Sequence, residues 1–140
     1  MTRYISVDNA APPPETARYS HAVEAGGFLF VTGQLPVDPD RPDAPLLETI
    51  EEQTELVFRN LAIIAEASGY ALSDAIFARI YLSEFDRDYA GLNAVYHRYF
   101  PGPRNLPGRT TVGVARLGRD ALVEIDLTLA RQVARSGDAG

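Results

Sequence analysis

Apolar side chains recur along the chain at two spacings, and each spacing predicts a different kind of element. Residues 49–68 place them three to four positions apart, the period of a helix with one buried face. Thr49 and Glu52 form a capping-box pattern at the start of this segment, and Gly69 favours its end. Residues 86–100 repeat the helical spacing and run into a Pro-Gly-Pro stop. The pattern therefore predicts two helices.

Shorter apolar or alternating runs predict strands around these helices. Gly26-Gly27 separates two such runs by the two residues typical of a tight hairpin. Residues 36–47 are rich in proline and aspartate, which predicts a surface loop. The order of elements indicates an α+β fold with helices on one face of a sheet. The predicted strands cover residues 1–7, 20–25, 28–33, 75–82, 109–115 and 121–130.

Alternation along the last two predicted strands divides the sheet into two faces. In residues 121–130 every second side chain is apolar, and Glu124 lies among the others. The same alternation groups Arg109 with Thr111, and we predict that Arg109 and Glu124 share the more polar face. A tight hairpin centred on Gly118-Arg119 would separate these two residues by about 13 Å along the strand. One cleft is therefore expected to take them from different subunits.

The composition restricts the chemistry. The 140 residues predict one domain over residues 1–130, with a flexible tail over residues 131–140. The chain holds no Cys and no Lys, and all 13 basic residues are Arg. These absences exclude a thiolate nucleophile, a Schiff-base lysine and a Walker lysine. Because the two His residues lack ligand spacing, we expect no metal site, and we expect no cofactor.

The net charge and the hydropathy of the chain predict which partners it has and where it is located. The net charge is −6 and no concentrated basic patch is present, so we expect no nucleic-acid partner. No apolar run approaches the ~18 residues of a membrane span. The first residues lead into no signal-peptide stretch. We expect a soluble cytoplasmic protein without a membrane partner.

Arg109 and Glu124 are the strongest candidates for a functional site. Arg109 opens a strand after a Pro-Gly turn, where its guanidinium can grip a carboxylate through two hydrogen bonds. Glu124 lies in mid-strand, where a half-buried carboxylate can orient a water molecule. Each has an ordinary interpretation as well. Arg109 is alternatively a surface arginine, and Glu124 one partner of a cross-strand ion pair.

Four further positions are weaker candidates. Tyr19 precedes a strand and could stack on a planar substrate, with a core or interface tyrosine as the alternative. Thr32 and Gly33 end an apolar strand, where backbone N–H groups often meet a ligand. Their alternative is a plain strand exit at glycine. Asn93 lies on the second predicted helix, either as a hydrogen-bonding group at an interface or as an exposed residue.

Several short motifs resemble the RidA/YjgF family in order and spacing over residues 15–130. They are Arg18-Tyr19-Ser20-His21-Ala22, Phe30-Val31-Thr32-Gly33-Gln34-Leu35-Pro36, Asn93 with Tyr96 and Phe100, Pro107-Gly108-Arg109-Thr110, and Ala121-Leu122-Val123-Glu124-Ile125. The chain departs from the family pattern at a few positions. Ala17-Arg18 stands where Gly-Pro is usual, Thr32 replaces a Ser, and Thr111 replaces a Cys.

The resemblance implies a chorismate-mutase-like α+β fold, a six-stranded sheet with two helices on one face. It also implies a homotrimer with ligand clefts between subunits. The implied reaction is hydrolysis of enamines and imines of the 2-aminoacrylate type to 2-oxo acids and ammonia. Arg109 resembles the family's carboxylate-binding arginine, and Glu124 the glutamate that places the attacking water. Tyr19, Thr32, Gly33 and Asn93 resemble other cleft residues, and Thr111 beside Arg109 is a further candidate for substrate binding.

Two other functions remain open at this point. One is a non-catalytic trimer that binds small 2-oxo acids, because a cleft can bind such molecules without turning them over. The other is RNA cleavage, an activity attributed to some relatives. The acidic chain and the lack of a His/Lys acid–base set disfavour RNA cleavage.

Overall fold

Both predicted helices are present in the computed structural model, which describes residues 1–131. Helix α1 spans Ile50–Ala67, and the side chain of Thr49 accepts a hydrogen bond from the backbone N–H of Glu52, which completes the predicted capping box. Helix α2 spans Phe85–Tyr99. The predicted tail lies outside the described residues from position 132 onward.

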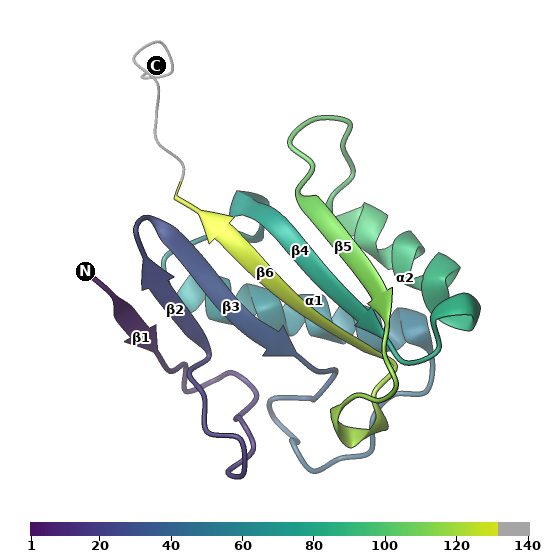
Figure 1. Ribbon diagram of the computed structural model, residues 1–140. Helices are drawn as coiled ribbons and strands as arrows, with labels where there is room; N and C mark the ends of the chain where they lie inside the picture. The colour runs from purple at the N-terminus through teal and green to yellow at the C-terminus, as the bar shows by residue number, and fades with distance from the viewer. Residues whose placement is uncertain (132–140) are drawn as a thin grey trace.

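The six predicted strands form one mixed sheet in the order β1-β2-β3-β6-β4-β5 (Figure 1). The predicted hairpin at Gly26-Gly27 is confirmed, since these glycines have φ of 60° and 82° and bring Ala25 opposite Phe28. The strands are β1 Arg3–Ile5, β2 Ala22–Ala25, β3 Phe28–Gln34, β4 Ala75–Leu82, β5 Gly108–Gly113 and β6 Val123–Ala130.

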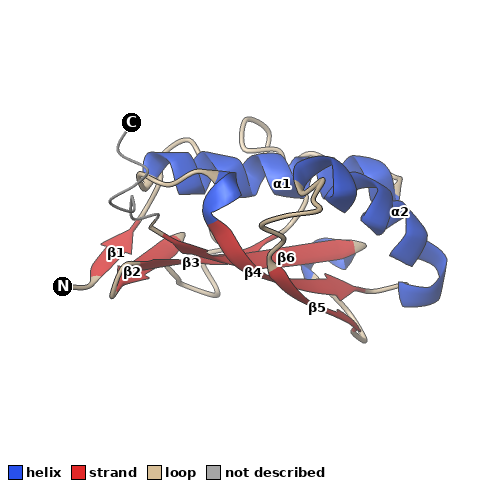
Figure 2. Cartoon of the chain, turned by 90° about the horizontal axis from the view of Figure 1, so that it is seen from above, coloured by secondary structure: helices blue, strands red, loops and turns tan. Residues whose placement is uncertain are grey.

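Both helices cover the same face of this sheet, and the core lies between the two layers (Figure 2). Burial alternates strictly along β6, where the apolar residues of the helix-facing side are buried and the others are only half-buried. Phe58 is fully buried on α1 and stacks on Tyr99 of α2 with ring centroids 4.4 Å apart, which joins the two helices. The predicted α+β architecture is therefore confirmed. In the described part of the chain, neither helix is long and apolar enough to cross a membrane.

The predicted hairpin between the last two strands is wrong. Strand β5 pairs in parallel with β4, and β4 lies between β5 and β6 (Figure 1). Helix α2 supplies the long crossover that a parallel pair requires. The turn around Gly118–Asp120 then carries the chain past the end of β4 to begin β6. The strand order depends on this crossover, and the alternation of apolar and polar residues along a strand does not reveal which strand lies beside it.

The strand order also corrects the predicted face of Arg109. Arg109 lies beside Ala78 of β4, and Ala78 is fully buried on the helix-covered side. Because neighbours across a ladder share a face, Arg109 points to the helix side. Glu124 lies opposite Tyr81 on the other side, which we call the open face. Arg109 and Glu124 therefore lie on opposite faces of the sheet.

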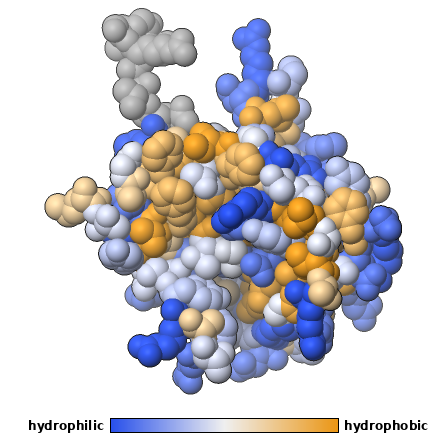
Figure 3. All heavy atoms as spheres, in the orientation of Figure 1, coloured by the Kyte–Doolittle hydropathy of each residue, from blue (hydrophilic) through white to orange (hydrophobic). Residues whose placement is uncertain are grey.

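The open face carries both exposed aromatic and charged side chains. Figure 3 shows hydrophobic groups gathered over this face, with strongly hydrophilic residues between them. The alternation places Phe28 and Phe30 of β3 on it, 41% and 49% exposed, and Phe77 of β4, 40% exposed. Arg79 donates to Asp126 across the strands at 2.8 Å. This face combines apolar area with a charge pair that fixes register.

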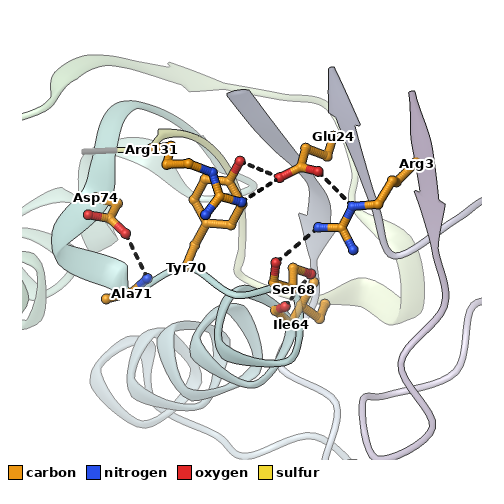
Figure 4. Close-up of polar contacts among 8 residues, drawn as sticks. All are labelled: Arg3, Glu24, Ile64, Ser68, Tyr70, Ala71, Asp74 and Arg131. Carbon is orange, nitrogen blue, oxygen red and sulfur yellow. Dashed lines mark hydrogen bonds and ion pairs between the residues drawn. The ribbon is translucent and has the colours of Figure 1, made fainter. Parts of the chain in front are cut away.

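A polar cluster surrounds Glu24 of β2, near the edge of the sheet that β1 forms (Figure 4). Its carboxylate accepts hydrogen bonds from Arg3 at 2.6 Å, from the Tyr70 hydroxyl at 2.6 Å and from Arg131 at 3.0 Å. These hydrogen bonds, with Arg3 the largest contributor, lower the pKa of Glu24 to about 2. The cluster links β1, the end of α1 and the end of β6.

Candidate active site

Arg109 lies at the start of β5, and its side chain is directed at α2. Nη2 donates to Asn93 Oδ1 at 2.6 Å, and Nε donates to Thr111 Oγ1 at 2.7 Å. The guanidinium carbon lies 4.5 Å from the ring centroid of Tyr96 and 5.7 Å from that of Tyr89. No acidic side chain within residues 1–131 pairs with it. Arg109 is therefore a half-buried cation held in one orientation.

The local sequence spacing explains why these partners meet. Tyr89, Asn93 and Tyr96 follow one another at four and three positions, so they share one face of α2. Thr111 is two residues beyond Arg109 and points to the same side of β5. Only two of the five guanidinium N–H donors are engaged by these residues. The remaining donors can bind a carboxylate.

Glu124 lies near the start of β6 on the open face. Burial raises the pKa of its carboxyl group, and the negative charge of Asp126 raises it further. Within the described residues no hydrogen bond or ion pair engages this carboxylate. The cross-strand ion pair considered for Glu124 forms instead at Asp126, with Arg79. Glu124 is therefore free to accept a proton.

Gly33 lies against the Glu124 carboxylate, and Tyr19 is near enough for the charge of Glu124 to affect its hydroxyl. A Cβ added to Gly33 would lie 3.1 Å from Glu124 Cδ and closer still to Oε2, so only glycine fits there without movement. Burial raises the pKa of the Tyr19 hydroxyl, and the negative charge of Glu124 contributes to this shift. These three residues form a second cluster, separate from that of Arg109.

Thr32 supports this second cluster from within the chain. Its Oγ1 donates to the carbonyl of Ser20 at 2.7 Å, and its N–H donates to the carbonyl of His21 at 3.0 Å. The N–H of Thr32 is therefore not available to a ligand, contrary to the expectation for this strand end. The pairing of β3 with β6 shifts register between Val31 and Gln34, so Gly33 lies at an irregularity of the ladder.

His21 has a structural role in this region. Its Nδ1 accepts from the N–H of Val7 at 2.9 Å, which leaves Nε2 to donate to the carbonyl of Ala11 at 2.8 Å. Both ring nitrogens are thus used to hold the proline-rich segment that follows β1. Across residues 1–131, no group of three His, Cys, Asp or Glu side chains is placed to hold a metal ion.

Arg109 and Glu124 cannot meet within one chain. Arg109 is in register, through Ala78, with Leu127 of β6, three residues from Glu124. The two Cα positions are thus about 10 Å apart along the strands and about 10 Å across them. Their side chains also point to opposite faces. A ligand that touches both groups must lie between two copies of the chain.

Sequence reasoning missed two residues of the Arg109 cluster. The sequence indicated Tyr96 only as part of a motif with Asn93 and did not single out Tyr89, yet both rings lie over the guanidinium of Arg109. Their spacing from Asn93 was a usable signal, since residues three and four positions apart share a helix face. The parallel pairing that brings β5 beside α2 was needed to interpret it.

An α+β sheet with a preoriented arginine and an unpaired, half-buried carboxylate defines a small-ligand-binding class of protein. The family model described as endoribonuclease L-PSP matches residues 9–131. A RutC family protein from Pyrococcus horikoshii is 40% identical over 126 residues, which cover 90% of this chain and 95% of that protein. The chain belongs to the RidA/YjgF family.

Solved structures and further relatives agree with this assignment. The YjgF gene product from E. coli has a TM-score of 0.81 and 28% identity, covering 93% of this chain and 99% of that one. A 2-iminobutanoate/2-iminopropanoate deaminase from Dermatophagoides farinae is 34% identical over 83% of this chain and 87% of its own. A yeast relative, 32% identical over 91% of this chain and 84% of its own, is named a mitochondrial protein, so the cytoplasmic location stays a prediction.

Proposed function

We propose that the chain forms a homotrimer that hydrolyses reactive 2-imino acids and their enamine tautomers to 2-oxo acids and ammonia. One observation carries the proposal: Arg109 and Glu124 are both without a charged partner in residues 1–131, and they lie on opposite faces of the sheet. A cleft between subunits brings Arg109 of one copy to Glu124 of the next. The name of the mite relative supports this choice of reaction.

In this proposal the Arg109 cluster binds the substrate carboxylate. Asn93 and Thr111 hold the guanidinium through two of its donors, so the free donors face the ligand in a fixed orientation. A charge-assisted pair of hydrogen bonds fixes both the position and the plane of the carboxylate. The attached imine carbon is then presented toward the neighbouring subunit.

Glu124 supplies the proton acceptor for the attacking water. Water adds to the carbon of the protonated imine while Glu124 takes one of the water protons, which gives a neutral carbinolamine. Glu124 then returns this proton to the nitrogen, the carbon–nitrogen bond breaks with release of ammonia, and the carbinol O–H loses its proton to water as the carbonyl forms. The raised pKa of Glu124 makes it a stronger base than an exposed carboxylate.

Hydrolysis of an imine requires few other protein groups. An imine carbon is electrophilic, more so once its nitrogen is protonated, so orientation and one base supply most of the acceleration. We therefore propose a reaction without metal or cofactor. Tyr19 and Gly33 complete the wall beside Glu124, with Thr32 holding that wall in place.

A coupled assay separates the deaminase from a non-catalytic binding protein. A serine or threonine dehydratase releases the enamine, and the rate of 2-oxo acid formation is followed with and without this protein. We expect acceleration by the wild type and by Arg59→Ala, an exposed control on α1. Glu124→Gln should lower turnover by ~10²-fold while keeping affinity for a 2-oxo acid. Unaccelerated release with intact binding would favour the binding protein.

Mixing two inactive variants tests the shared cleft directly. Arg109→Ala and Glu124→Gln are unfolded together in equal amounts and refolded, so that subunits combine at random. In a trimer each mixed assembly regains one intact cleft, which restores roughly a quarter of wild-type activity. Each variant refolded alone serves as the control. Absence of recovery, with a trimeric mass confirmed by light scattering, would refute the shared cleft.

RNA cleavage is a less well supported function, although the family model carries an endoribonuclease name. The chain is acidic, with a net charge of −6, which opposes binding to a phosphate backbone. His21 uses both ring nitrogens in structural contacts. Neither cluster pairs a base with a general acid suited to a ribose.

A further inference from the structure

Two oppositely charged side chains lie beside Glu124 on the open face of the sheet. Asp126 is two residues beyond Glu124 on β6, and Arg79 of β4 is directly opposite Asp126 (Figure 1). Residues two apart on a strand share a face, so the carboxylates of Asp126 and Glu124 project from the sheet on the same side. No step of the proposed reaction uses Asp126 or Arg79.

Hydrogen bonds hold the Asp126 carboxylate at both of its oxygens. Arg79 Nε donates to Oδ1 at 2.8 Å, and the Tyr81 hydroxyl donates to Oδ2 at 3.2 Å. Tyr81 is opposite Glu124 in the register, so its side chain reaches diagonally across the face to Asp126. The Asp126 side chain is only 14% exposed, whereas that of Arg79 is 61% exposed. The position of this carboxylate next to Glu124 is therefore fixed by two neighbours on β4.

The other titratable groups that face Glu124 are uncharged tyrosines. Tyr19 comes from the segment before β2, and Tyr81 from β4. Burial raises the pKa of both hydroxyl groups, and nearby carboxylates raise it further, so both remain neutral where a glutamate titrates. Strand β3 contributes Gly33, which has no side chain. Within residues 1–131, the charges that face Glu124 are therefore those of Asp126 and Arg79.

The proposed reaction sets two requirements on the Glu124 carboxyl group. It takes a proton from water and then returns this proton to the nitrogen, so its proton affinity must suit both steps. The negative charge of Asp126 makes Glu124 a stronger base, and the positive charge of Arg79 opposes this effect. Arg79 and Asp126 therefore act on the same carboxyl group in opposite directions.

We propose that Arg79 and Asp126 are positioning residues that act on the reaction through Glu124, because their opposed charges set how strongly it holds a proton. The inference rests on the proposed function, in which Glu124 is the base. Residues two apart on a strand are about 7 Å from each other, and a unit charge at that distance shifts a pKa by about half a unit in a watery environment. In the proposed homotrimer, a neighbouring copy that excludes water from the open face would enlarge the effect.

Carbon NMR titration of Glu124 tests the charge pair without any substrate. Glutamate is labelled at its carboxyl carbon, and the Glu124 resonance is identified by its absence from Glu124→Gln. We expect Asp126→Asn to lower the pKa of Glu124 by about half a unit. Arg79→Gln should raise it by a smaller amount, since Arg79 is diagonal to Glu124 and more exposed. In the double variant the two effects should largely offset each other.

Matched variants separate the effect of charge from that of packing. Arg79→Lys keeps the positive charge, so Glu124 should titrate as in the wild type. Arg41→Gln removes an exposed arginine from its pair with Asp38, on the loop of residues 36–47, and should leave the titration of Glu124 unchanged. Light scattering checks that each variant has the wild-type mass, and Arg79→Met replaces Arg79→Gln if that variant does not assemble.

A pH–rate profile of the dehydratase-coupled assay, with dehydratase in excess, distinguishes this inference from the proposed function. Shifts of opposite sign in Asp126→Asn and Arg79→Gln, followed by the acid limb of the rate profile, would support both. An unchanged titration of Glu124, or shifts of the same sign, would overturn the charge pair and leave the deaminase proposal intact. Opposite shifts in the titration that the rate profile does not follow would remove Glu124 from the proposed reaction, and this inference with it.

Discussion

Gly33→Ala is a one-carbon change that tests whether the position of the Glu124 carboxylate controls turnover. Gly33 is not among the residues with positive φ, so alanine meets no backbone strain there. The added Cβ would lie 3.1 Å from Glu124 Cδ and 3.3 Å from Cγ, and closer to Oε2. Ordinary contact between such atoms needs 3.4 Å or more. The carboxylate must therefore move.

The size of this movement sets the expected loss. The nearest contact is the carboxylate end of a flexible side chain, so the protein adjusts by shifting that end by about 1 Å and keeps its fold. A 1 Å error in the position of a catalytic group can cost about 10²-fold in rate. We expect kcat to fall by about that factor, with the affinity for 2-oxo acids, which depends on Arg109, nearly unchanged.

A double-mutant cycle supplies the control. The dehydratase-coupled assay is run on Gly33→Ala, Glu124→Gln and the double variant. If Gly33→Ala acts through Glu124, the double variant should be little slower than Glu124→Gln alone, because interacting residues do not add. Wild-type turnover in Gly33→Ala, or fully additive losses in the double variant, would refute the link between this contact and the reaction.

Three further predictions concern binding, pH and stability. Arg109→Ala should raise the KM of an imino acid at least ~10-fold, since a hydrogen bond to a charged group contributes about 1.5–3 kcal/mol. Arg109→Lys should restore little of the lost affinity, because a point charge lacks the guanidinium fork. A wild-type KM in either variant would contradict this prediction. Because the pKa of Glu124 is raised, kcat/KM should decline on acidification before an ordinary glutamate would protonate, and Asp126→Asn should move that decline to lower pH in a pH–rate profile. Glu24 has a folded-state pKa of about 2 against an ordinary 4.5, so its contribution to the free energy of unfolding is full above pH 4.5 and is lost as the pH falls toward 2. Denaturant titrations of Glu24→Gln should show a loss in the free energy of unfolding at neutral pH that disappears in acid. Glu66→Gln, at an exposed position on α1, should match the wild type.

Local signals predicted the individual elements well. The capping box from Thr49 to Glu52 needs only four residues of sequence, and α1 begins where it indicates. The two glycines at positions 26 and 27 provide the positive φ values of the hairpin turn, so that pairing was also visible. The capping box and the hairpin turn both depend on residues that are neighbours in sequence, so a few adjacent residues are enough to predict them.

Strand order depends on contacts distant in sequence, and this is where prediction failed. Adjacent strands β5 and β6 suggested a hairpin, yet β4 pairs with both and separates them. A parallel neighbour for β4 became possible because α2 is long enough to cross over the sheet. Nothing in the alternation of residues 109–115 distinguishes the two arrangements, because either buries one side of the strand.

The site follows from this strand order and not from the residues alone. Had β5 paired with β6, Arg109 and Glu124 could have shared a face, although about 13 Å of strand would still have separated them. With β4 between them, Arg109 gains the aromatic and amide groups of α2, while Glu124 keeps an open face without a charged partner in residues 1–131. In the proposed reaction Arg109 would hold the substrate carboxylate and Glu124 would activate the water, so that hydrolysis would require these two groups from neighbouring copies of the chain.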